Sequence, residues 1–119
     1  MKVAVTSQGQ TLESAVDPRF GRAAYILVVD PETKEFEVLD NASNANAFKG
    51  AGIQAATMVA DRGAEVLMTG YCGPKAFQTI QAAGIKVVND VSGTVAEAVA
   101  QFKRGDVVYT DSANADAHW

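Results

Sequence analysis

The second half of the chain repeats a strand, a glycine-containing turn and a helix, and this order restricts the possible folds. Apolar runs and helical spacing predict strands at 65–69 and 85–88 and helices at 75–83 and 94–103. Pro74 suits the first turn of a helix, and Thr94 with Glu97 forms a capping-box pattern. Strands that alternate with helices in this way predict parallel strands joined by right-handed helical crossovers.

The first half contains three strand-like runs before its only clear helix. The predicted strands are 2–6, 25–30 and 35–40, and the predicted helix is 53–60. The turn "DPETKE" joins the second strand to the third as a hairpin. The order βββαβαβα therefore predicts an α/β fold with a single mixed five-stranded sheet flanked by helices. We assign residues 1–108 to one α/β domain and residues 109–119 to a polar C-terminal tail.

Length, charge and residue usage exclude several classes of protein. A chain of 119 residues suits one domain with its own core. The net charge of −4 argues against general binding to nucleic acid, which needs a dominant basic face. The longest apolar runs are far below the roughly 18 residues of a membrane span. The first residues lack a signal-peptide pattern, so we expect a cytoplasmic protein with no membrane partner.

Four loops that are distant in sequence should meet at one edge of the predicted sheet. They contain "SQGQ" with "DPRFGRA", "FKGAG", "TGYCGPK" and "NDVSGT". In open α/β sheets, the ligand crevice lies outside the carboxyl ends of the strands. Each predicted helix also points its N-terminus at this edge, with a partial positive charge and several N–H groups that lack helical partners.

Glycines and cationic side chains are concentrated in these loops, which predicts an anion site on an acidic protein. Glycine lets backbone amides approach a ligand closely. The candidate cofactor-binding residues are Ser7, Arg19, Phe20, Arg22, Lys49, Gly50, Gly52, Gly70, Tyr71, Cys72, Gly73 and Lys75. Alternatives remain for several of them: glycine-rich turns are common in α/β proteins, either arginine could pair with Asp17, and Phe20 could belong to the core.

Cys72 is the only cysteine of the chain. Its place between a strand and a helix N-terminus is one that lowers the pKa of a thiol, so the sequence predicts a thiolate-favouring environment. Nucleophilic catalysis would need a base, and the only histidine, His118, lies far away in the tail. Cys72 could therefore be a direct metal ligand, a residue that lines a bound group, or a small structural residue in the turn.

Most of the chain, from about residue 1 to 105, resembles the dinitrogenase iron–molybdenum cofactor biosynthesis family of the NifX and NifB C-terminal type. The resemblance is carried by "KVAVTSQGQ", "VDPRFGRAAYILVVD", "FKGAGIQAATMVADRGAEVLMTGYCGPKAF" and "AGIKVV". Its most specific parts are "FGRA" and the turn with Gly70, Gly73, Pro74 and Ala76. It implies a ribonuclease H-like fold and a carrier, without enzymatic activity, that binds an anionic metal–sulfur cluster noncovalently. The implied cargo contains molybdenum, and a molybdenum–copper sulfide is one candidate; proteins that receive the cluster are implied partners.

One departure from the family pattern concerns Arg19, which stands where several relatives have a histidine that is thought to help hold the cluster. A guanidinium cannot ligate a metal, but it can donate hydrogen bonds to sulfides and neutralise their charge. We therefore expect binding mainly by electrostatics and backbone amides. Two other functions stay open: an enzyme acting on a phosphorylated small molecule, with Asp17 and Asp90 as the obvious loop carboxylates, and a protein-interaction module.

Overall fold

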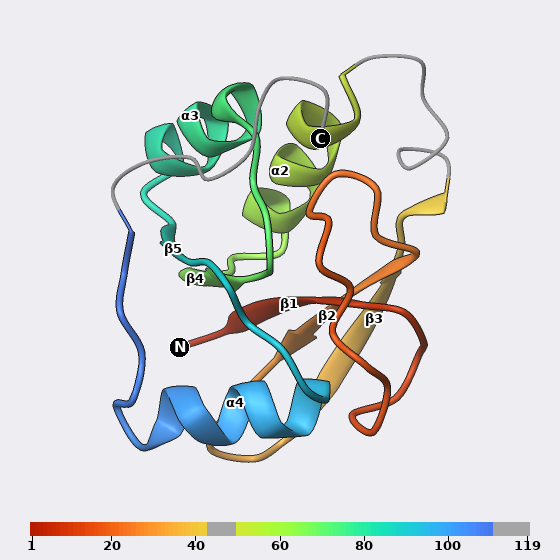
Figure 1. Ribbon diagram of the computed structural model, residues 1–119, viewed down its shortest axis with the longest axis vertical. Helices are drawn as coiled ribbons and strands as arrows, with labels where there is room; N and C mark the ends of the chain where they lie inside the picture. The colour runs from red at the N-terminus through yellow and green to blue at the C-terminus, as the bar shows by residue number, and fades with distance from the viewer. Residues whose placement is uncertain (43–49, 111–119) are drawn as a thin grey trace.

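A mixed sheet with helices on both faces forms the centre of the computed structural model, which describes residues 1–42 and 50–110 (Figure 1). The elements in chain order are β1 (Val3–Ser7), β2 (Tyr25–Val29), β3 (Phe36–Asp40), α2 (Ala51–Asp61), β4 (Val66–Met68), α3 (Pro74–Ala82), β5 (Lys86–Val88) and α4 (Val95–Lys103). The predicted order βββαβαβα is confirmed, and the observed boundaries differ from the predicted ones by at most two residues.

The five strands lie in the order β3-β2-β1-β4-β5. The hairpin strands β2 and β3 are antiparallel to each other, whereas β4 runs parallel to both β1 and β5. Ser7 pairs with Tyr25, which pairs in turn with Asp40, so β1 and β3 end at the same edge of the sheet. The parallel strands β4 and β5 end there too, and this mixed sheet confirms the ribonuclease H-like fold.

Two hydrophobic layers hold the helices on the sheet because successive strand residues face opposite sides. Ala4 and Leu67 point into the layer beneath α2 and α3, together with Phe77. Val3 and Val5 point into the layer beneath α4. Figure 1 shows α2 and α3 on one face and α4 alone on the other. The N-termini of α2 and α3 therefore lie near the carboxyl edge on one face of the sheet, and the N-terminus of α4 lies near it on the other.

The predicted helix ends are confirmed by their backbone geometry. Gly63 and Gly84 have positive φ angles of 75° and 79°, the left-handed conformation that ends a helix without a Cβ clash. Pro74 occupies the first turn of α3. Thr94 and Glu97 form the reciprocal capping box at the start of α4, with hydrogen bonds of 3.1 and 3.0 Å.

The segment after α4 returns to the edge strand β5. The Thr110 N–H donates to the Val87 carbonyl at 2.8 Å, and the Lys86 ammonium lies 5.0 Å from the centre of the Tyr109 ring. The first two residues of the predicted tail thus contact the domain, and residues 111–119 lie outside the described part of the chain. Within the described ranges, no helix is long and apolar enough to cross a membrane.

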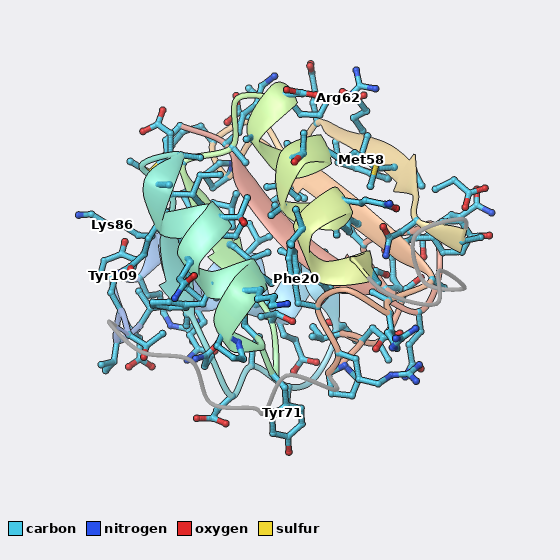
Figure 2. The ribbon with its side chains drawn as sticks, turned by 90° about the horizontal axis from the view of Figure 1, so that it is seen from above. Phe20, Met58, Arg62, Tyr71, Lys86 and Tyr109 are labelled. Carbon is cyan, nitrogen blue, oxygen red and sulfur yellow. The ribbon has the colours of Figure 1, made fainter. Side chains whose placement is uncertain are left out.

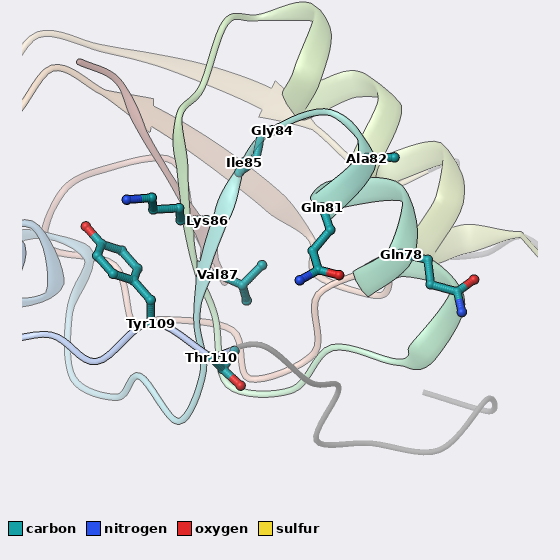
Figure 3. Close-up of a pocket in the computed structure, with 9 residues that line it drawn as sticks. All are labelled: Gln78, Gln81, Ala82, Gly84, Ile85, Lys86, Val87, Tyr109 and Thr110. Atoms are coloured by element: carbon teal, nitrogen blue, oxygen red, sulfur yellow. The ribbon is translucent and has the colours of Figure 1, made fainter.

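An open groove lies beside this returning segment, at the C-terminal half of α3 (Figure 3). Its lining consists of Gln78, Gln81, Ala82, Gly84, Ile85, Lys86, Val87, Tyr109 and Thr110. The predicted anion site lies at the N-terminal end of the same helix. The groove is therefore a separate feature of the surface.

Candidate anion-binding site

The predicted meeting of distant loops is seen directly between "DPRFGRA" and the turn that follows β4. Arg19 pairs with Tyr71 in a short parallel bridge, and the Phe20 N–H donates to the Tyr71 carbonyl at 3.0 Å. The turn after β5 joins them, because the Asp90 N–H donates to the Gly70 carbonyl at 3.0 Å. Backbone hydrogen bonds thus hold three of the four loops together at the carboxyl edge.

Close contacts between small residues bring in the fourth loop, at the start of α2. A Cβ on Gly21 would lie 2.7 Å from the backbone of Gly52, and a Cβ on Gly52 would lie 2.7 Å from the Cβ of Ala76. A Cβ on Gly70 would meet Pro18 at the same distance. We call Gly21, Gly52 and Ala76 the small-residue seam. The sequence predicts that Gly52 and Gly70 let backbone amides approach a ligand, and in the structure the absence of their side chains lets chain segments pack closely.

The N-termini of α2 and α3 lie on either side of this seam and have glycine N-caps. Gly50 and Gly73 each accept the first helical hydrogen bond through the carbonyl, at 2.9 Å, but neither has a side chain that could cap the helix. Among the described residues, the first-turn N–H groups of Lys75 and Ala76 have no hydrogen-bond acceptor. Both helix ends therefore present partial positive charge at the carboxyl edge.

The N-terminus of α4 differs, and the expectation of available N–H groups is wrong there. The Val95 N–H donates to the Ser14 carbonyl at 2.9 Å, and the Ala96 N–H donates to the Leu12 carbonyl at 2.8 Å. The Glu97 N–H is bound by the hydroxyl of Thr94. The long loop after β1 therefore satisfies this helix end, and only the helices on the opposite face can offer N–H groups to a ligand.

The two arginines of "DPRFGRA" have different surroundings. Arg19 is half-exposed, and its Nε lies 3.6 Å from the carboxylate of Asp17, which is almost completely buried. Arg22 is partly buried and has contacts of its own. Lys75 is exposed in the first turn of α3. Asp17 is thus the partner of Arg19, and the predicted Lys49 lies outside the described residues.

Three of the predicted site residues have buried side chains. Ser7, Phe20 and Cys72 are exposed by 0, 2 and 0%. The Ser7 hydroxyl donates to the Gly9 carbonyl at 2.7 Å, and Phe20 packs in the layer beneath α2 and α3. In this conformation these side chains offer no surface to a ligand, so we keep only the exposed residues as proposed direct contacts.

The prediction that the thiol of Cys72 has a lowered pKa is wrong. Burial raises the pKa of this thiol to about 12, because the apolar surroundings disfavour the charged thiolate. The side chain belongs to the core beneath α2 and α3 rather than to the surface beside the helix end. Desolvation by burial is therefore the cause of the raised pKa.

Two large hydrophobic residues in or next to these loops are exposed, and two belong to the core. Tyr71 and Ile53 are exposed by 39 and 40%, whereas Phe20 and Phe77 are buried. Figure 2 shows Tyr71 projecting from the molecule, with Phe20 in the interior. The backbone of Tyr71 pairs with the arginine loop, so its exposed side chain stands at the border of the site.

Two buried polar groups that the sequence did not single out hold the site in place. The Asn41 side-chain amide donates to the carbonyls of Gly21 and Ala23, at 3.2 and 2.8 Å. The Thr6 hydroxyl donates to the Asp17 carbonyl at 2.6 Å. Thr6 has one hydroxyl hydrogen and a carbonyl can only accept, so the Thr69 hydroxyl, 2.9 Å away, donates to Thr6. A polar residue directly after a strand, such as Asn41, is the only sequence signal for this role.

The site therefore combines backbone N–H groups with cationic side chains. Within residues 1–42 and 50–110, no group of three or more His, Cys, Asp or Glu residues could hold a metal ion. The described donors suit an anion, which accepts hydrogen bonds and positive charge.

These features define a small ribonuclease H-like α/β domain whose carboxyl edge presents amides and cations. The chain matches the family described as "Dinitrogenase iron-molybdenum cofactor" over residues 1–105, and it belongs to that family.

Solved structures of two relatives have the same fold. The apo form of the orange protein from Desulfovibrio gigas is 50% identical, with a TM-score of 0.93 and coverage of 96% of each chain. A NifB-like protein from Thermotoga is 33% identical, with a TM-score of 0.82 and coverage of 96% of this chain and 97% of its own. An uncharacterised protein from Methanocaldococcus jannaschii is 27% identical over 108 residues, which cover 88% of this chain and 87% of that protein.

Proposed function

We propose that the protein binds and carries an anionic metal–sulfur cluster, without catalysing a reaction. The observation that carries this proposal is the pair of glycine-capped helix N-termini at one edge of the sheet, beside Arg19 and Lys75. Two helix ends and two cations favour an anion more strongly than one helix end does. The family and the apo structure of the orange protein support a metal-containing cargo.

The cargo we propose contains molybdenum and sulfide, with a molybdenum–copper sulfide as the specific candidate. A preformed cluster of this kind brings its own sulfide ligands, so the protein does not need to supply a full set of metal ligands. Sulfides on its surface accept hydrogen bonds from amides and guanidinium groups. The buried thiol of Cys72 would have to become accessible and lose its proton to ligate a metal, and the proposal does not depend on it.

A carrier also needs a partner that receives the cargo. Tyr71 and Ile53 are large exposed hydrophobic residues at the border of the same edge. They are suitable first contacts for such a protein, because aromatic and aliphatic side chains are common anchors at interfaces. The alternative of an enzyme for phosphorylated molecules is less favoured, since Asp17, one of its two candidate carboxylates, is buried against Arg19.

The test is uptake of tetrathiomolybdate with copper, followed by visible absorption. We expect Arg19→Glu and Lys75→Glu each to weaken uptake at least about tenfold, because each replaces an attractive charge with a repulsive one next to a polyvalent anion. Lys2→Glu is the matched control, since Lys2 is exposed at the start of β1, at the opposite edge of the sheet. Unchanged uptake in both site variants, or an equal loss in the control, would contradict the proposal.

A further inference from the structure

Asp17 is a buried carboxylate in a site that we propose for an anion, and this conflict calls for a physical reason. Its side chain is only 4% exposed, and its Oδ1 accepts a hydrogen bond from the Arg19 backbone N–H at 3.0 Å. The same oxygen lies 3.6 Å from the Nε of Arg19. A fixed negative charge therefore lies directly beneath a cation of the site.

The turn itself does not need this charge. An asparagine would offer the same side-chain oxygen to the Arg19 N–H, and Asn and Asp are both common in such turns. The backbone of Asp17 is also anchored independently, since its N–H donates to the Thr6 carbonyl at 2.9 Å and its carbonyl accepts from the Thr6 hydroxyl. Burial of a carboxylate carries a desolvation penalty that a neutral amide largely avoids. The charge of Asp17 must be explained by something other than the shape of the loop.

We propose that Asp17 is an internal counter-ion that weakens anion binding at Arg19 and so keeps the cargo releasable. This inference rests on the proposed function, because it concerns the strength of the same site. Asp17 lies on the protein side of Arg19, whose side chain is 49% exposed and can meet an anion from the solvent side. The bound anion then feels the guanidinium and, a few ångströms further away, the opposing carboxylate. Asp17 positions Arg19 through the turn and moderates its attraction through its charge.

The charge dependence of the effect separates this role from a structural one. Coulomb energy is proportional to the charge of the ligand, so the logarithm of the change in affinity for a dianion should be twice that for a monoanion. A residue that only shapes the loop would not produce this ratio. Tetrathiomolybdate, with two negative charges, and thiocyanate, with one, are suitable probes because both present sulfur.

The experiment compares the wild-type chain with Asp17→Asn by amide chemical-shift titration against each probe. We expect Asp17→Asn to bind tetrathiomolybdate about tenfold more tightly and thiocyanate about threefold more tightly, for one charge removed at roughly 7 Å in a half-exposed site. Dissociation of tetrathiomolybdate should slow by a similar factor. Asp17→Ser, whose hydroxyl can accept the same N–H bond, is a second neutral variant and should tighten binding in the same ratio.

The matched control is Glu37→Gln, which also removes one negative charge and breaks an ion pair with an arginine. Glu37 lies 3.2 Å from Arg62, at the C-terminal end of α2 and therefore far from the site. Unchanged or weaker binding by both neutral variants, or equal tightening in the control, would overturn the role of Asp17. If the wild-type chain does not bind tetrathiomolybdate at all, the proposed function fails and this inference fails with it.

Discussion

The N-termini of α3 and α4 lie at the same edge of the same sheet, but their first N–H groups have different hydrogen-bond partners. At α4, loop carbonyls and the Thr94 hydroxyl accept hydrogen bonds from the first N–H groups. At α3, the N-cap is Gly73, and no side chain caps the helix. A helix end is therefore an anion-binding feature only when the rest of the fold leaves its N–H groups available.

The long loop after β1 produces this difference. Its first part, with Leu12 and Ser14, contacts the N-terminus of α4, and its second part, with Pro18 and Phe20, contacts the turn before α3. The first part supplies carbonyls to the helix end, whereas the second part pairs with backbone groups of Tyr71 and brings Arg19 to the site. The loop after β1 thus binds the N–H groups at the N-terminus of α4 and places the cation Arg19 beside the N-terminus of α3.

The largest effect should come from the small-residue seam that holds the α2 and α3 ends together. Alanine normally stabilises a helix relative to glycine, but a Cβ on Gly52 would lie 2.7 Å from that of Ala76. We expect Gly52→Ala to lower the free energy of unfolding by about 2 kcal/mol, because the overlap forces the helices apart. Denaturant unfolding measures the change.

The double variant Gly52→Ala with Ala76→Gly is the control for this seam. It removes the overlap and exchanges alanine and glycine between the two helices, so their helix propensities nearly cancel and most of the loss should be recovered. A neutral or stabilising Gly52→Ala would show that the helix ends are not held by this contact. The contact between Gly52 and Ala76 would then not explain how the N-termini of α2 and α3 are held together on their face of the sheet.

The next effect concerns Cys72, whose thiol lies behind the α3 end. Its pKa is about 12 in the folded protein, above the ordinary thiol value, so only the unfolded chain ionises between about pH 9 and 12. The contribution of the neutral thiol to the free energy of unfolding is therefore fully present below pH 9, and it is lost as the pH rises. We expect the wild type to lose about 1.4 kcal/mol per pH unit in this window relative to Cys72→Ala.

Chemical unfolding at pH 8, 9.5 and 10.5 measures this difference, and the subtraction removes the shared titration of lysines and tyrosines. The opposite sign, with the wild type gaining stability at high pH relative to Cys72→Ala, would show a stabilised thiolate. The N-terminus of α3 would then stabilise the Cys72 thiolate, as the sequence predicts. This thiolate would already neutralise part of the positive charge of that helix end.

A smaller effect should come from the capping box of α4. We expect Thr94→Ala to lower the free energy of unfolding by about 1 kcal/mol, because the Glu97 N–H loses its partner. Binding of tetrathiomolybdate should stay within a factor of two, since this helix end takes no part in the site. Thermal unfolding and anion titration of the same sample test both statements, and a clear loss of affinity would bring α4 into the site.

Local patterns were sufficient to predict most of the fold. Pro74, Gly84 and the pair Thr94 with Glu97 each act within one turn of helix, so their roles could be inferred from neighbouring residues. The meeting of the loops followed from the chain order of strands and helices, because strands joined by helical crossovers run parallel and end at one edge of the sheet. These features are confirmed because short-range rules determine them.

The details of the site depend on contacts between distant segments, and the sequence did not reveal these. The roles of Gly52 and Gly70 follow from what packs against them, and so does the burial of Cys72. The sequence left open which arginine pairs with Asp17, and the structure places Arg19 beside that carboxylate. A local pattern can place a residue in a loop, but only the packed structure decides which groups remain exposed.

The most direct test of the contrast between the two helix ends is an amide chemical-shift map of the protein titrated with tetrathiomolybdate. The first-turn amides of α2 and α3, including those of Lys75 and Ala76, should shift progressively and saturably. The amides of Val95, Ala96 and Glu97 in α4 should stay in place, because their hydrogen bonds are already made. Shifts concentrated at α4, or spread evenly over the surface, would contradict the assignment of the site to the α2 and α3 ends.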